Sequence, residues 1–194
     1  MVLLNPDRYG AGLAALVREE RLNPLDAGKP NDAARPQLDE LTVECAFAGR
    51  RVADPMMAQA CLAGVWLYHN YLGPSHAISQ SIPTPTGSCW HAIMHRREPD
   101  FDNSNYWFNR VGEHPIFPEL RRAAAEEASD STTHVSHLFL LDQQRWDPMA
   151  FVDLCEANRL GRTPGEHLCR WIQLREWELL FEYSFRGALG EGDS

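Results

Sequence analysis

Residues 163–187 read TPGEHLCRWIQLREWELLFEYSFRG, and this stretch predicts the longest helix of the chain. Its apolar residues cover so wide an arc of a helix that they would contact several neighbours at once, as in a central helix. They are Leu168, Trp171, Ile172, Leu174, Trp177, Leu180, Phe181 and Phe185. Thr163 and Glu166 have the spacing of a capping box, so we expect the helix to begin there. We expect it to end near Gly187, followed by a loose tail to Ser194.

Two Asp-Pro pairs predict the starts of further helices, at Asp54-Pro55 and Asp147-Pro148. In each pair the Asp side chain can accept hydrogen bonds from the first free amides, and Pro suits the first helical position. Strand-like alternation is almost absent, and only residues 134–141 could form a short strand or a buried turn. We therefore predict an all-α fold, with residues 1–194 forming a single compact multi-helix domain.

Composition excludes several classes of function. The chain has 194 residues and a formal net charge of −9, whereas sequence-independent nucleic-acid binding and docking on an anionic membrane both require a basic surface. No apolar run is long enough to span a membrane, and residues 1–8 do not resemble a secretory signal. The five cysteines are an odd number without a C-x-x-C pair, which favours reduced, buried thiols. We expect a cytoplasmic protein.

The segment WHAIMHRRE, residues 90–98, carries the sharpest candidate chemistry. We expect Thr86 or Ser88 to cap a helix that runs to about Glu98. Spacings of four and three residues then place His91, His95 and Glu98 on one helix face. Two imidazoles and a carboxylate suit zinc, iron(II) or manganese and leave positions for water or substrate. The alternative is an ordinary pair of helical histidines, one half-exposed and one bonded to a backbone carbonyl.

Two more histidines could complete such a metal shell. His69 follows the apolar residues Leu62, Val65 and Trp66 on the expected inward face of the helix that starts at Pro55. His76 lies just beyond Gly73-Pro74, in a segment that could be a short helix or an irregular arm. Taken singly, each also suits a purely structural role, as a core histidine and a loop histidine.

A second cluster combines aromatic and basic residues. Together these residues could surround a carboxylate, a phosphate or a sugar, because guanidinium groups form paired hydrogen bonds with oxyanions. They are Trp90, Arg96, Arg97, Asp100, Tyr106, Trp107 and Arg110, and the nearby Asp102, Asn103 and Asn105 add short polar groups of the kind found in sugar and cation sites. In this hypothesis Arg96 or Arg97 guides an anionic substrate toward the metal. The alternative is that part of this cluster belongs to the core.

Cys89 offers a nucleophile as a competing hypothesis. A cysteine at a helix N-terminus can have a lowered pKa. However, the sequence has neither the G-x-S-x-G motif nor a strand to carry it. We therefore rank covalent catalysis below the metal hypothesis.

The run WHAIMHRREPDFDNSNYWFNRVGEHP, residues 90–115, resembles a signature of a family of uncharacterised bacterial proteins. The resemblance extends through FVDLCE at 151–156 and REWELLFEY at 175–183. It implies neither a substrate nor catalytic residues.

Three functions follow as hypotheses. The first is a small-molecule enzyme, a hydrolase or isomerase, with a metal held by His91 and His95, completed by His69 or His76, and with Glu98 and Arg96 as catalytic groups. The second is a non-catalytic module that binds a small polar or anionic ligand through the aromatic and basic cluster. The third is a structural or interaction protein.

Overall fold

The computed structural model describes residues 4–130 and 134–191, and the regular structure in these ranges is entirely helical. The prediction of an all-α fold is confirmed. The first half of the chain forms α1 (Ala11–Val17), α2 (Arg35–Asp39), α3 (Val43–Ala46), α4 (Pro55–Tyr68), α5 (Leu72–Ser79) and α6 (Pro85–Arg97). The second half forms α7 (Phe101–Val111), α8 (Phe117–Asp130), α9 (Leu138–Asp142), α10 (Pro148–Arg159) and α11 (Glu166–Leu189). Short 3-10 helices lie at Pro6–Arg8, Asp32–Ala34 and Val135–His137.

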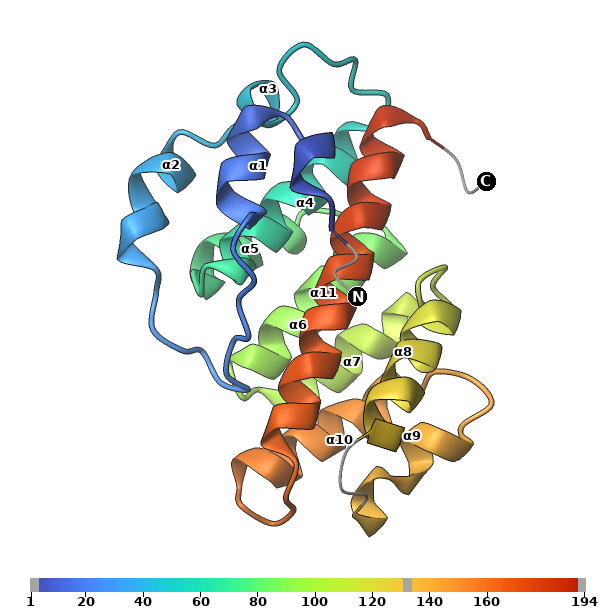
Figure 1. The fold of residues 1–194 in the computed structure, drawn as a ribbon. Helices are drawn as coiled ribbons and strands as arrows, with labels where there is room; N and C mark the ends of the chain where they lie inside the picture. The colour runs from blue at the N-terminus through green and yellow to red at the C-terminus, as the bar shows by residue number, and fades with distance from the viewer. Residues whose placement is uncertain (1–3, 131–133, 192–194) are drawn as a thin grey trace.

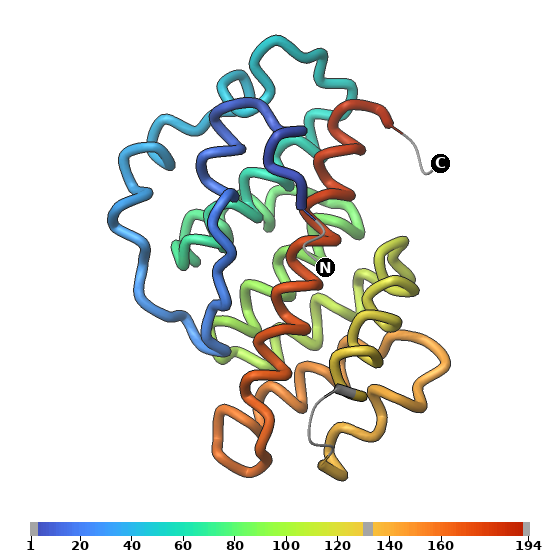
Figure 2. The backbone as a smooth tube through the Cα atoms, in the orientation of Figure 1, coloured from blue at the N-terminus to red at the C-terminus, as the bar shows by residue number. Residues whose placement is uncertain are grey.

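Helix α11 runs along the molecule and contacts α4, α6, α8 and α10 (Figures 1 and 2). Its buried residues lie on several sides, which confirms the prediction of a long, largely buried helix. The expected capping box is wrong. Gly165 is the N-cap, at φ 107°, and it packs so closely on His137 that an added Cβ would lie 2.5 Å from the ring. The helix ends at Leu189, and residues 192–194 of the expected tail lie outside the described residues.

Both Asp-Pro starts are confirmed. Asp54 Oδ1 accepts from the amides of Met56 and Met57 at 2.8 and 3.2 Å, with Pro55 as the first residue of α4. Asp147 accepts in the same way from the second and third residues of α10, at 3.1 and 3.0 Å.

Other boundaries differ from expectation for local reasons. The cap of α6 is Thr84, not Thr86 or Ser88. Its Oγ1 accepts from the Gly87 amide at 3.1 Å, so the helix begins at Pro85. Of the two alternatives for the segment of His76, the short helix is confirmed, and it begins at Leu72 because the left-handed Asn70 (φ 62°) turns the chain directly after α4. Residues 135–142 form a 3-10 turn and α9 rather than a strand.

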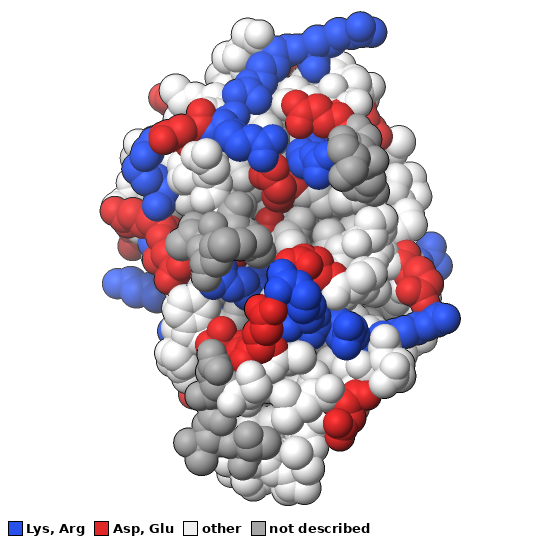
Figure 3. Space-filling view, turned by 45° about the vertical axis from the view of Figure 1, so that its right-hand side comes forward, with Lys and Arg blue, Asp and Glu red and all other residues white. Residues whose placement is uncertain are grey.

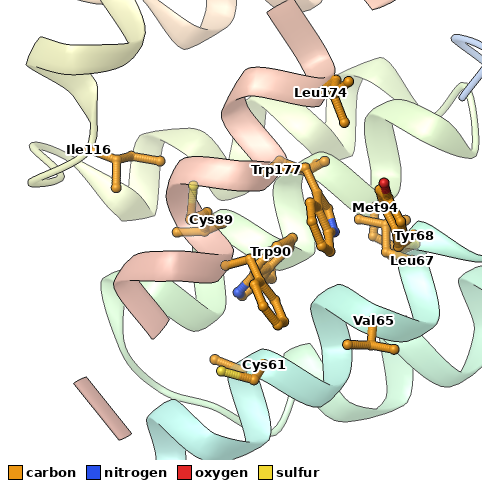
Figure 4. Close-up of a cluster of buried hydrophobic side chains, with 14 of the residues drawn as sticks. Cys61, Val65, Leu67, Tyr68, Cys89, Trp90, Met94, Ile116, Leu174 and Trp177 are labelled. Carbon is orange, nitrogen blue, oxygen red and sulfur yellow. The ribbon is translucent and has the colours of Figure 1, made fainter. Parts of the chain in front are cut away.

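The core is a single cluster of buried apolar side chains. Trp90 of α6 points between Cys61 of α4 and Trp177 of α11 (Figure 4). The Trp177 Nε1–H donates to the Gly64 carbonyl at 2.8 Å, so α4 and α11 are joined by a buried hydrogen bond as well as by packing. These contacts fix α6 against the long helix, with its second face turned toward α5 and α7.

Acidic and basic side chains are interspersed on the face shown in Figure 3, without one extended patch of a single sign. None of the helices in residues 4–130 and 134–191 is both long and apolar enough to cross a membrane.

Candidate metal centre

Helices α5 and α6 pack together and bring three imidazoles to one point, and α7 packs on α6 beside them. His91 and His95 lie one turn apart on α6, as their spacing predicts, and His76 reaches them from α5. One ligand nitrogen from each ring lies within 4.8 Å of the others. The ring centroids of His76 lie 4.6 Å from His91 and 5.1 Å from His95. Within the described residues, this trio is the grouping with the donor types and spacing of a metal site.

The three rings lie just beneath the surface. His91 and His95 are 3% and 4% exposed, whereas His76 is partly exposed. In the part of the chain that the structure describes, neither ring nitrogen of His91 has a hydrogen-bond partner, although both are buried. Leaving a buried polar group unpaired costs about 1–3 kcal/mol, so such groups are rare and call for an explanation.

The pKa of His91 is lowered to about 4, mainly by burial and in addition by the neighbouring His95 and His76. Its imidazole is therefore neutral at pH 7. A neutral imidazole carries the lone pair that a metal ion requires, so protons do not compete for this ligand near neutrality.

His95 has polar groups near both ring nitrogens, although its Nδ1 makes no hydrogen bond within the described residues. Its Nδ1 lies 3.3 Å from Glu98 Oε2 and 3.6 Å from Asp100 Oδ2, and its Nε2 lies 3.2 Å from Asn103 Nδ2. Burial lowers the pKa of His95, and the carboxylate of Glu98 opposes this shift. Glu98 therefore contacts one of the three rings and is not itself one of the three converging donors. A carboxylate in this position orients a metal-bound imidazole.

The indole of Trp107 covers the ring of His91. It stacks on His91 with ring centroids 4.1 Å apart and an interplanar angle of 17°. Tyr106 is 54% exposed and meets Trp107 edge-on at 5.5 Å. The predicted ligand-binding pair Tyr106 and Trp107 therefore does lie beside the histidines, on α7.

The structure does not bring His69 to this cluster. Its Nε2 lies 2.9 Å from the Leu16 carbonyl and its Nδ1 lies 2.9 Å from Asn31 Nδ2. Both ring nitrogens are thus engaged between α1 and the loop before α2. The expectation that His69 is a metal ligand is corrected to that of a core histidine, held by partners distant in the sequence.

Arg96 and Arg97 are corrected in the same way. Arg96 is fully buried and forms an ion pair with the fully buried Glu176 of α11. Arg97 Nε donates to the Asp26 carbonyl at 2.8 Å and Nη2 donates to Asn70 Oδ1 at 2.6 Å. Both guanidinium groups tie α6 to other segments, so neither is placed to guide a substrate.

Trp90 and Cys89 also belong to the core. The indole Nε1–H of Trp90 donates to Ser184 Oγ at 3.2 Å inside the protein, so this ring is not a ligand wall. Burial raises the pKa of Cys89, opposite to the shift expected at a helix N-terminus. The buried thiol therefore stays protonated, and the structure gives no support to the nucleophile hypothesis.

Sequence reasoning places Asn103 among the short polar groups after the histidine helix but does not predict its contact with His95. Asn103 lies eight residues after His95, across the break between α6 and α7, and no periodic pattern connects the two positions. Asp100, which also approaches His95, carries the only local signal: acids cluster just after the histidine helix.

No protein-family model, no curated protein and no solved structure matches this chain. The resemblance to a bacterial family therefore stays a prediction.

Proposed function

We propose that this chain is a metal-dependent enzyme acting on a small molecule, with one divalent ion held by His76, His91 and His95. The observation that carries the proposal is the convergence of three imidazoles, one of them buried with both ring nitrogens unpaired among the described residues. A cation would supply the missing partner, and three neutral nitrogen ligands suit zinc or iron(II) better than manganese.

The distances are compatible with closure around an ion. Tetrahedral zinc bonded to nitrogen at about 2.0–2.1 Å places its ligand nitrogens about 3.4 Å apart. The present separations, up to 4.8 Å, would need side-chain movements of roughly 1 Å. His76 is partly exposed and begins the second turn of a short helix, so it is the ligand with the greatest freedom to close.

Each neighbouring residue has a definite role in this proposal. If the His95 Nδ1–H faces Glu98, its Nε2 carries the lone pair, and the Asn103 amide that now faces Nε2 would turn aside. The stacked Trp107 holds the His91 ring in one plane. Three protein ligands leave a fourth position for water, whose pKa a zinc ion lowers to about 7. Metal-assisted hydrolysis is the reaction class that this arrangement suits best, with isomerisation as the second.

Calorimetric titration of metal-free, untagged protein with zinc tests the metal site. We expect one ion per chain, with uptake abolished in His91→Ala and His76→Ala. His69→Gln and the surface variant His167→Ala should keep uptake, because neither residue belongs to the cluster. Circular dichroism shows whether each variant folds. Uptake that is unchanged in both His91→Ala and His76→Ala, or absent from the native protein, would refute the site.

The catalytic part of the proposal requires a separate assay. Zinc-loaded protein and the folded His76→Ala variant are compared on panels of esters, amides and phosphoesters. Turnover that requires both zinc and His76 supports an enzyme, whereas zinc uptake without turnover on any panel would favour a metal-binding protein.

The two alternative functions differ in their support. Of the residues expected for a ligand-binding module, Tyr106 and Trp107 lie beside the histidines. Trp90, Arg96 and Arg97 are instead engaged by partners inside the protein. An interaction protein would use exposed apolar side chains, and those of Val135, Leu138 and Leu141 are the closest to such a patch. That third function stays a hypothesis.

A further inference from the structure

A groove of about 430 Å³ lies beside the histidine cluster. One wall is the segment between α5 and α6, and the other comes from the second half of α7. The lining residues are Gln80, Ile82, Pro83, Thr84, Pro85, Ser88, Trp107 and Arg110. Its volume falls within the range of about 300–1,000 Å³ that is usual for small-molecule sites.

The groove shares its walls with the candidate metal centre. Trp107 lines the groove and stacks on His91 at 4.1 Å. Ser88 lies nearly one helical turn before His91, and Gln80 lies one turn after His76, so both project toward the same side as the ligands. A molecule bound in the groove would therefore lie next to an ion held by the three imidazoles.

Arg110 makes the groove suitable for an anion. Among the described lining residues it is the charged one, and no carboxylate described in the structure lies within 4.0 Å of it. Glu113, three residues further along the chain and beyond the end of α7, pairs instead with Arg145 at 2.9 Å. The guanidinium carbon of Arg110 lies 5.4 Å from the centre of the Trp107 ring, within cation–π range. The aromatic ring thus supports the guanidinium group while its N–H donors stay available for an oxyanion.

The start of α6 adds to this preference. Pro85 is the first helical residue and lines the groove, so the positive end of the helix dipole faces the bound molecule. The remaining lining is apolar or neutral. Pro83, Pro85 and the Trp107 indole form a surface that would cover a hydrocarbon or aromatic body, and Ile82 lies buried behind it.

We infer that this groove binds the substrate of the metal centre, and that the substrate is a small organic anion. Arg110 holds a phosphate or carboxylate group, and the apolar wall covers the rest of the molecule. This inference rests on the proposed function for the identity of the bound molecule as a substrate. The anion site itself depends only on Arg110 and the groove. Arg110 here takes the role that the sequence had given to Arg96 and Arg97.

Calorimetry with phenyl phosphate, benzoate and inorganic phosphate tests the anion site, on both metal-free and zinc-loaded protein. The variant is Arg110→Gln and the matched control is Arg145→Gln, an exposed arginine outside the groove. A charge-assisted hydrogen bond corresponds to about a tenfold to hundredfold change in affinity. We expect Arg110→Gln to lower the affinity for phenyl phosphate or benzoate by at least about tenfold. Arg145→Gln should leave both affinities unchanged. The tighter of the two ligands shows whether phosphate or carboxylate is preferred, and weaker binding of inorganic phosphate than of phenyl phosphate would support the apolar wall.

The outcomes separate the two proposals. Suppose that zinc uptake requires the three histidines but anion affinity is equal in the native protein and Arg110→Gln. This result would refute the anion site in the groove and would leave the proposed metal centre unaffected. Anion binding that depends on Arg110 without zinc uptake would overturn the metal enzyme and leave an anion-binding module. No measurable binding of any of the three anions, to either form of the protein, would overturn the inference from the groove.

Discussion

Breaking the ion pair between Arg96 and Glu176 should destabilise the protein more than most single substitutions. Both side chains are completely buried. Arg96 Nη1 lies 3.4 Å from Glu176 Oε1, a second and shorter contact joins Nη2 to Oε2, and the guanidinium carbon lies 4.8 Å from the centre of the Phe151 ring. Removing either partner leaves one uncompensated charge in the core.

The expected magnitude follows from that burial. Loss of one member of a buried pair costs about 3–5 kcal/mol, because the remaining charge has neither water nor a counterion. Typical total stability is about 5–15 kcal/mol, so Arg96→Met or Glu176→Leu would each remove a large fraction of it. With a change of about 2–4 °C per kcal/mol for a chain of this size, Tm should fall by roughly 6–20 °C. The double variant leaves no stranded charge, and it should be at least as stable as either single variant.

Urea denaturation followed by circular dichroism measures the four proteins of this double-mutant cycle. We expect the double variant to lose at least about 2 kcal/mol less than the sum of the two single variants. Strictly additive losses, or single losses under about 1 kcal/mol, would refute the account of a buried, mutually compensated pair. Zinc uptake should persist in each folded variant. Loss of uptake at full stability would show that Arg96 does act at the metal site, as its sequence position had suggested.

Four further outcomes are expected. Zinc at 100 times its Kd should stabilise the native protein by about 2.7 kcal/mol, or roughly 5–11 °C in Tm, and should not shift the Tm of His91→Ala. For metal-free protein, the pKa of His91 is lowered to about 4 while the unfolded chain binds a proton near pH 6.5, so the free energy of unfolding should fall as the pH is lowered across that window. The part of this fall that His91 causes, allowing for solvent screening, is on the order of 1–2 kcal/mol. Urea denaturation at several pH values should therefore show a free energy of unfolding that depends less on pH in His91→Gln than in the native protein. The same pH dependence in both proteins would contradict the lowered pKa. Gly87→Ala should lower the free energy of unfolding by at least about 2 kcal/mol in the same assay, because its Cβ would lie 2.2 Å from the Ile82 carbonyl oxygen. The control Gly73→Ala should lower it much less, because no atom lies within 4 Å of the added Cβ. A thiol reagent should label one cysteine per native chain, the exposed Cys45, and labelling of more at the same rate would contradict the burial of the others.

The predictions that succeeded depend on contacts within one turn of helix. An Asp followed by Pro caps its own helix, and histidines four residues apart share a face wherever the helix lies in the molecule. The same local reasoning fails for the capping box at Thr163, because a tertiary contact of Gly165 with the His137 ring decides how that helix starts.

The errors at the candidate site come from partners that are distant in the sequence. Every residue of α6 from Thr86 to Arg97 is buried, so periodicity could not separate its solvent face from its core face. Arg96 meets Glu176, which lies 80 residues later, and His69 meets Leu16, which lies 53 residues earlier. Only the packing of α4, α6 and α11 shows that these groups have partners. The same packing leaves His91 without one among the described residues.

That contrast is the strongest physical argument for a ligand at the histidines. The fold supplies partners to the other large polar groups of this region: an ion pair for Arg96, carbonyls for Arg97, a hydroxyl for Trp90. Single atoms elsewhere in the described residues also lack a partner, Arg96 Nε and Ser75 Oγ among them, but His91 is the ring with both nitrogens unpaired. An apolar residue of similar size would pack beside the two further imidazoles without that desolvation cost. Departures from local consistency of this kind concentrate at functional sites. The unpaired His91 ring, and not the number of histidines, is therefore what favours a metal centre over a merely polar patch in the core.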